Sequence, residues 1–307
     1  MEPKKRLGKG LEDISHLFLS PAQPPQQKSA LTENRPEPIA RGSLPRVIGV
    51  ISGTPDIPTI FWTGHLALAL ARDGKKVLVV DVGTDKDELA SVLQPVAIQP
   101  SLGDLLDQPE KAVTVDGPLG LRVLAFQMQR EELRRFKQEE REILFQILRK
   151  EEQQADALLL NISFDWTDLD ALSYLKCLHE AVLVVSTRDL LGAYRILKVL
   201  VHVQPGLRVG LVEYREPDAT TQTRVDRIVM ASKEFLKRSP LVLGWIPSDS
   251  FMMQSIAAKA PLLLSDQEGP GLQTLLEIGK RVFKGLNGQE SRGLFFDAIQ
   301  AQLTLGS

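Results

Sequence analysis

Three features that define large classes of protein are scarce in this sequence: cysteine, long apolar runs and an excess of charge of one sign. Cys177 is its single cysteine, which excludes an internal disulfide framework and fits a reducing compartment. It lies in an apolar helical run, so we expect a small buried side chain rather than a nucleophile.

No run approaches the ~18 apolar residues of a membrane-spanning helix. Residues 1–6 do not lead into the apolar core of a signal peptide, so we expect a cytoplasmic protein. The formal net charge of −2 gives no global attraction to nucleic acid or to anionic lipid. The basic residues at 224–238 are interpreted as a solvated helix face, and DNA binding is not expected.

Histidine is also scarce, and its four positions lie far apart in the sequence: His16, His65, His179 and His202. No cluster of His, Cys, Asp and Glu has the spacing of metal ligands. We therefore expect no metal site built from these side chains, and structural roles for the histidines.

What is present is an ordinary globular composition, with 43% apolar and 25% charged residues in a chain of 307. It divides into four regions. We predict a short amphipathic docking segment (1–20), a disordered Pro-rich linker (21–45), an α/β domain (46–285) and a C-terminal tail (286–307).

The docking segment has apolar residues at helical spacing, and basic residues are concentrated near its start, at 4–9. Two interpretations stay open: a poorly ordered terminus, or a helix that folds on binding a protein partner. Under the second, the partner-binding residues are Leu7, Leu11, Ile14, Leu17 and Phe18.

Short, unbroken apolar runs alternate with helical patterns through the domain, and the helices are predicted at 60–73, 131–154, 168–179, 190–203, 226–238 and 271–283. The runs include 77–80, 157–160, 181–185 and 208–212, and their continuity predicts strands covered on both faces. The alternation predicts a doubly wound, mostly parallel α/β sheet with helices on both faces. Ligands of such sheets bind beyond the carboxyl ends of the strands.

The stretch 46–83 predicts a strand (47–52), a loop (53–59), a helix (60–73) and a second strand (76–81). Phosphate-binding α/β proteins carry a Gly-rich loop at this place, whose N–H groups and one lysine hold the phosphates. Here the loop has two prolines, an acid and no lysine. The prolines remove two N–H donors and stiffen the loop.

Residues 46–285 resemble the MinD/ParA family of P-loop ATPases, with FlhG-type regulators of flagellar number and position as the most similar branch. The resemblance rests on the order and spacing of five segments: 52–53, 66–81, 100–106, 120–124 and 244–261. It implies the P-loop NTPase fold. Residues 7–11, Leu-Gly-Lys-Gly-Leu, also resemble the N-terminus of ParB proteins, which in that family engages a ParA-type ATPase.

The departures from this family lie at its chemical positions. The resemblance implies a loop with lysines, glycines and a hydroxyl that binds Mg²⁺. Aligned from Gly53 without gaps, this sequence has in their place Thr54, Pro55, Asp56, Ile57, Pro58, Thr59 and Ile60. Thr54 occupies the aligned position of the family's signature lysine. Thr59 occupies that of the lysine that contacts the phosphates, and Ile60 that of the hydroxyl that binds Mg²⁺.

Elsewhere, Asp81 is kept, but Gly83 replaces the water-activating Asp and Asn161 replaces an acid linked to Mg²⁺. Tyr214 replaces the Asn of the adenine-reading pair, and Arg215 is kept. The resemblance with these departures implies a degenerate Walker A loop, no catalytic residue and no cofactor. ATP with Mg²⁺ in an atypical site stays as the alternative.

These inferences predict a non-catalytic scaffold or adaptor in bacterial spatial organisation, such as polar, flagellar, pilus or partition placement. Residues 6–20 would recruit a protein, for which a MinD/ParA-type ATPase is the candidate, and a homo- or heterodimer is open. The alternative is a functional ATP-binding ATPase with an atypical nucleotide site that regulates localisation. We expect the protein in the cytoplasm, and a peripheral position at the inner membrane or the cell pole stays open.

The last segment, 292–305, has a helical apolar face made by Leu294, Phe295, Ile299 and Leu303. Only Arg292 is basic nearby, whereas membrane-surface helices carry several basic residues. We favour packing on the protein's own surface or a partner's, with membrane binding as the weaker alternative.

Overall fold

The computed structural model describes residues 44–53, 58–83, 89–93, 113–124, 126–128, 130–163, 172–215, 225–258, 260–265, 269–285 and 294–304. The predictions for the docking segment 1–20, for the linker up to residue 43 and for loop residues 54–57 lie outside these ranges.

An eight-stranded sheet in the order β3-β4-β2-β5-β1-β6-β7-β8 organises the fold. All described pairs are parallel except β3 with β4, which confirms the predicted mostly parallel α/β class. The strands are β1 Arg46–Ser52, β2 Val77–Asp81, β3 Thr114–Asp116, β4 Arg122–Leu124, β5 Ala157–Asn161, β6 Glu180–Ser186, β7 Arg208–Arg215 and β8 Leu241–Pro247.

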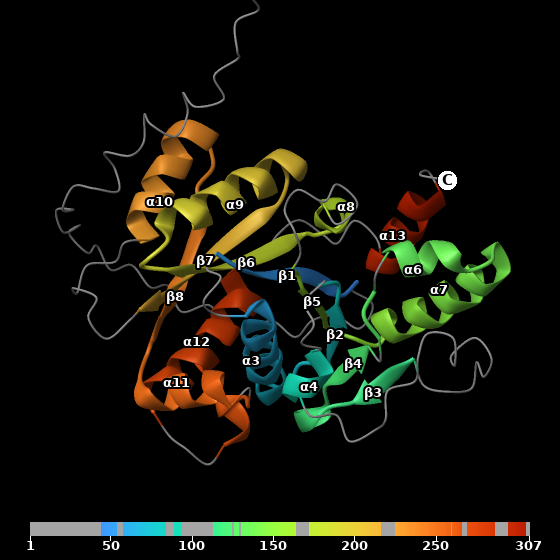
Figure 1. Cartoon of the computed structure of the whole chain (residues 1–307), viewed down its shortest axis with the longest axis horizontal. Helices are drawn as coiled ribbons and strands as arrows, with labels where there is room; N and C mark the ends of the chain where they lie inside the picture. The colour runs from blue at the N-terminus through green and yellow to red at the C-terminus, as the bar shows by residue number, and fades with distance from the viewer. Residues whose placement is uncertain are drawn as a thin grey trace, which may run out of the picture.

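Helices cover both faces of this sheet (Figure 1), as the buried central strands require. One face packs against α3 Thr59–Arg72, α4 Leu89–Leu93, α11 Ser250–Ala257 and α12 Pro270–Gly285. The other packs against α6 Arg130–Arg135, α7 Gln138–Gln153, α8 Leu172–Leu175, α9 Leu190–Val203, α10 Val225–Ala231 and α13 Phe295–Thr304. Three short turns complete the described elements: η1 Pro118–Gly120, η2 Ser232–Leu236 and η3 Leu262–Leu264.

The long charged helix predicted over 131–154 is wrong in one respect, because it is two helices, α6 and α7. The chain breaks at Phe136 and Lys137. There the Glu140 carboxylate accepts the Lys137 N–H at 2.8 Å and begins the new helix. A carboxylate is favourable at this end of a helix, and apolar periodicity alone does not reveal such a restart.

Two other helices are also shorter than predicted. In the described part of 168–179 only α8 is helical, and the chain then turns into β6. The pattern at 226–238 is α10 followed by a π-helical turn, η2. Each ends a few residues before the next strand, β6 or β8, begins to pair with the sheet, and this long-range pairing is not contained in the local sequence.

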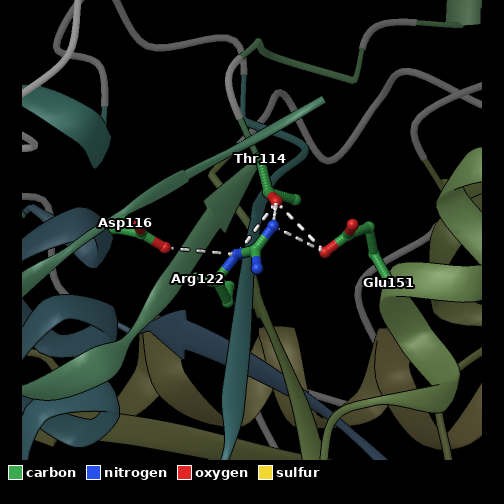
Figure 2. A network of polar contacts seen from close by, with 4 residues as sticks. All are labelled: Thr114, Asp116, Arg122 and Glu151. Atoms are coloured by element: carbon green, nitrogen blue, oxygen red, sulfur yellow. Dashed lines mark hydrogen bonds and ion pairs between the residues drawn. The ribbon is translucent and has the colours of Figure 1, made fainter. Parts of the chain in front are cut away.

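A polar network fixes the antiparallel edge, β3 and β4, to the end of α7 (Figure 2). The Arg122 guanidinium donates to the Thr114 hydroxyl and forms an ion pair with Glu151 at 2.9 Å, with Asp116 at 3.6 Å on its other side. Strand β3 was not predicted, since three residues are too few for a periodicity.

The C-terminal helix α13 packs into the same core as the sheet, against α7, rather than standing apart as a tail. All four residues of its predicted apolar face are buried, and so is Phe296. In this fold the face is covered by the protein's own α7, as we favoured, and it is not presented to lipid. Among the described helices, none combines the length and the apolarity needed to cross a membrane.

Candidate functional site

The candidate site lies at the carboxyl ends of β1, β2, β5 and β7, the edge at which ligands of doubly wound sheets bind. Here β1 ends and its chain turns towards α3. The Gly53 N–H donates to the Val184 carbonyl at 2.7 Å. A Cβ on Gly53 would lie 3.0 Å from both the Ala193 Cβ and that carbonyl, so close packing on α9 requires glycine here.

Thr59 and Ile60, which stand where the resemblance places the phosphate lysine and the Mg²⁺ hydroxyl, are both buried. The Thr59 hydroxyl accepts the Ser52 N–H at 3.3 Å, and Ile60 packs in the core under α3. Pro58, exposed, precedes the helix and makes no side-chain cap. The first turn of α3 is therefore tied back to β1 by uncharged side chains.

Asp81, the one acid kept from the expected set, is buried and accepts four hydrogen bonds. They come from the Gly83 N–H and Asn161 Nδ2 at 2.9 Å, and from the Leu89 N–H and Gln127 Nε2 at 3.3 Å. Burial raises the pKa of this carboxyl, and the hydrogen bonds, Asn161 first, oppose the rise. Its two oxygens are thus occupied by protein donors.

Asn161 connects Asp81 to helix α3. It is fully buried at the end of β5, directly beside Asp81 in the parallel register. Its Oδ1 lies 3.3 Å from the Thr63 hydroxyl, which also donates to the Thr59 carbonyl at 3.0 Å. A continuous polar chain therefore runs from α3 through Asn161 to Asp81 (the Asp81–Asn161 network).

Gly83 lies against this network. A Cβ there would stand 3.1 Å from Asp81 Oδ1, from Asn161 Nδ2 and from the Ser163 carbonyl. That separation is tighter than ordinary contact, so the position that the resemblance assigns to a water-activating Asp has little room for a side chain. The network and the absence of a Cβ at Gly83 fit each other.

Tyr214 is buried on the α3 side of the sheet. Its hydroxyl donates to Ser248 Oγ at 2.8 Å, and its ring meets Trp62 edge-on with centroids 5.5 Å apart. Trp62 is one helical turn away from the loop, on α3. Aromatic rings thus fill this part of the core, where the resemblance places an adenine-reading Asn.

Arg215 points to the other face of the sheet. It forms an ion pair with the buried Glu213 at 3.1 Å, and its guanidinium lies over the Trp245 ring, 4.4 Å from the centroid. Side chains of adjacent strand residues point to opposite faces of a sheet, so Tyr214 and Arg215 lie on opposite sides of this one. Arg215 is committed to Glu213 and Trp245.

His65 and Cys177 are both buried in the core. His65 is fully buried, accepts the Leu262 N–H at Nε2 and contacts the Phe61 carbonyl at Nδ1, and burial lowers its pKa to about 4. Burial likewise raises the pKa of the Cys177 thiol to about 12. Within the described ranges no group of three His, Cys, Asp or Glu residues is placed to hold a metal.

Sequence reasoning found Asp81, Gly83 and Asn161 but missed three residues that complete the site: Trp62, Thr63 and Gln127. Thr63 could have been predicted, because it lies four residues after Thr59 and hence on the same face of the helix. Gln127 had none, since it reaches Asp81 only through the folding of β4 against β2.

The comparisons with solved structures decide the fold. The chain aligns with the MinD cell division ATPase of Pyrococcus furiosus at 22% identity and a TM-score of 0.55, over 78% of this chain and 98% of that one. It aligns with the Pyrococcus horikoshii MinD complexed with Mg-ADP at 19% identity and 0.59, over 80% and 100%. The chain has the MinD/ParA-like P-loop ATPase fold.

A ParA family ATPase from Chlorobium tepidum has the same fold, at 16% identity and a TM-score of 0.56 over 78% of this chain and 99% of that one. No family model and no curated protein sequence matches. The MinD/ParA-like fold accounts for about four-fifths of the chain. In it the Asp81–Asn161 network lies at the carboxyl ends of β2 and β5, beside β1.

Proposed function

We propose that this chain is a non-catalytic MinD/ParA-like protein that acts as a scaffold or adaptor in bacterial spatial organisation, such as polar, flagellar, pilus or partition placement. The observation that supports this most is the Asp81–Asn161 network. The single carboxylate kept at the site has its oxygens engaged by Asn161, Gly83, Leu89 and Gln127.

Phosphoryl transfer depends on positioned cations and N–H donors around the phosphates. In the proposal these are absent from the loop, because Thr59 and Ile60 are buried and uncharged and two prolines replace donors. Each lost charge-assisted contact costs about 3 kcal/mol in related sites. The loss of several such contacts would leave too little binding energy for ATP.

Isothermal titration of the full-length chain with ATP and Mg²⁺ tests this. We expect no saturable heat up to about 1 mM nucleotide, the range in which a ligand gains only about 4 kcal/mol. The P. horikoshii MinD, whose structure holds Mg-ADP, serves as the positive control. Micromolar binding by this chain would make the alternative, a functional ATP-binding regulator of localisation, the better description.

Recruitment is the second part of the proposal. Among the solved structures with this fold is a MinC:MinD cell division complex from Aquifex aeolicus, so the fold is found in a protein complex there, with 19% identity to this chain and a TM-score of 0.57. For this chain we propose that residues 6–20 bind the partner, a MinD/ParA-type ATPase, in the cytoplasm or at the cell pole. The apolar stripe Leu7, Leu11, Ile14, Leu17 and Phe18 would supply the contact.

A pull-down of candidate MinD/ParA-type ATPases from the same genome tests the stripe. We expect capture by the full-length chain and loss of at least tenfold when Leu11 and Leu17 are both replaced by Glu. Gln26→Glu, which adds charge in the linker, is the matched control and should capture normally. Equal capture by all three proteins would remove residues 6–20 from the proposal.

A further inference from the structure

Exposed apolar side chains are frequent in residues 230–245 of the described structure. Val242 (40% exposed) and Trp245 (42%) belong to one face of β8, since they pair with Leu211 and Glu213, which share a face of β7. Met230 (60%) and Phe235 (42%) precede the strand, whereas Leu241 pairs with Gly210 and belongs to the other face. A single exposed apolar side chain is normal, but neighbours on one strand face mark an interaction surface. We call Val242 and Trp245, with Arg215 beside them and the exposed residues of 230–238 that precede the strand, the β8 surface.

The surface is exposed because of the position of β8 in the sheet. Val242 pairs with Leu211 and Trp245 with Glu213, and Leu211 packs in the core that includes α10. Residues on that face of β7 are covered by helices, whereas Val242 and Trp245 beside them are not. Among the described residues, the helical layer on this side therefore ends before the last strand, and no described helix covers Val242 and Trp245.

Trp245 is held in place rather than left to move. The Arg215 guanidinium lies 4.4 Å from its ring centroid, and Arg215 is itself fixed by the fully buried Glu213 at 3.1 and 3.2 Å. Cation–π contacts of this kind orient an aromatic ring. Trp and Arg are both among the residue types enriched at the hot spots of protein interfaces.

A partner would reach side chains here rather than pair with the backbone of the edge strand. The Leu243 carbonyl already accepts the Arg281 guanidinium at 3.0 Å. Gly244 has φ +150, and the pairing register shifts between Leu211 and Val212. Bulges and charged covers of this kind protect an edge against strand addition.

The charge of the surface indicates the chemistry of its partner. Three of the exposed charged residues between 230 and 245 are basic, Lys233, Lys237 and Arg238, against one acid, Glu234. An acidic partner is favoured on such a surface. The chain's own residues 1–20 hold four basic and three acidic residues, so they do not supply the acidic segment that this charge favours.

We propose that the β8 surface binds an acidic amphipathic segment of a protein partner, with Trp245 as the central apolar contact. Apolar side chains of that segment would cover Val242 and Trp245, and its carboxylates would meet Lys237 and Arg238. This site is separate from residues 6–20 and from the Asp81–Asn161 network. It does not depend on whether the chain binds ATP.

The probe for a test is a fluorescent helical peptide of about 15 residues, with Leu on one face and Glu on the other, titrated against the full-length chain. The comparison probes are the same peptide with Lys in place of Glu, a scrambled Leu/Glu peptide, duplex DNA and phosphatidylglycerol vesicles. The variants are Trp245→Ala and the double Lys237→Glu, Arg238→Glu. Ile143→Ala, at an exposed apolar residue of α7, is the matched control.

We expect saturable binding of the Leu/Glu peptide, at least tenfold weaker in both β8-surface variants and unchanged in Ile143→Ala. Affinity should fall with added salt, and the Lys peptide should not bind. Circular dichroism confirms that each variant is folded. Absence of saturable binding, equal binding of the scrambled peptide or no effect of Trp245→Ala overturns the proposal. Stronger binding of DNA or vesicles through the same residues also overturns it, in favour of a nucleic-acid or lipid surface.

Discussion

Asn161→Asp is expected to lower the free energy of unfolding by about 3 kcal/mol or more at pH 7, the cost of an uncompensated buried charge. The substitution restores the acid that the family resemblance places at this position. In this fold it sets a second carboxylate beside Asp81 in a fully buried place, where the Asn161 amide now donates at 2.9 Å. A favourable hydrogen bond is thus replaced by like charges.

The pH dependence of this variant follows from the same geometry. Two carboxyl groups this close share one proton, so the folded state holds a proton that the unfolded state has lost above about pH 4. The variant's loss of stability relative to the wild type therefore grows as the pH rises above about 4 and shrinks as the pH falls below it. Urea unfolding of the wild type and the variant between pH 4 and 8 measures the difference.

Adding Asp81→Asn to Asn161→Asp serves as the control. It removes the like charge and should recover part of the stability. Recovery is incomplete because Gly83, Leu89 and Gln127 still aim donors at position 81, where an amide offers one oxygen instead of two. If Asn161→Asp alone is as stable as the wild type at pH 7, the predicted cost of a second carboxylate beside Asp81 is wrong.

The second large effect concerns Glu152, which holds the C-terminal helix. This carboxylate is fully buried on α7 and accepts the N–H groups of Phe295 and Phe296 at 2.6 and 3.1 Å, at the start of α13. Burial raises its pKa to about 7; the two N–H donors lower it, and the nearby Asp297 adds to the rise. Asp297 itself is paired with Arg149 at 2.8 Å.

Because this pKa is raised on folding, the folded state binds a proton between about pH 4.5 and 7 that the unfolded state does not. The stability that Glu152 contributes therefore falls as the pH rises through this window, by about 3 kcal/mol in total. Glu152→Gln cannot titrate. We expect the stability difference between wild type and Glu152→Gln to move by that amount across the window.

Urea unfolding from pH 4.5 to 8 checks this, with the exposed Glu142→Gln on the same helix as the matched control. Asp81 and Glu180 also have raised pKa values, so the wild-type profile alone does not isolate Glu152. The difference between the profiles of the wild type and Glu152→Gln isolates the contribution of Glu152. Parallel profiles for wild type and Glu152→Gln would show that Glu152 is not the titrating group.

Much of the fold was predictable from local pattern. The apolar runs at 77–80, 157–160 and 181–185 correspond to β2, β5 and β6, because a strand covered on both faces must be apolar throughout. The predicted helices at 60–73 and 190–203 correspond to α3 and α9. The break between α6 and α7 and the short strand β3 depend on single side-chain contacts, and periodicity does not show these.

The sequence by itself determined the frame, a mostly parallel α/β sheet, and the substitutions at 53–60, 81, 83, 161 and 214, because residue types and their spacing are local properties. Tertiary structure alone decided how the remaining polar groups are used. Gln127, Asn161 and the N–H of Leu89 reach Asp81 from separate parts of the chain. Likewise Trp245 is exposed because the described helices of its face do not reach the last strand. Contacts between distant segments are set by how the elements pack, which no local pattern encodes.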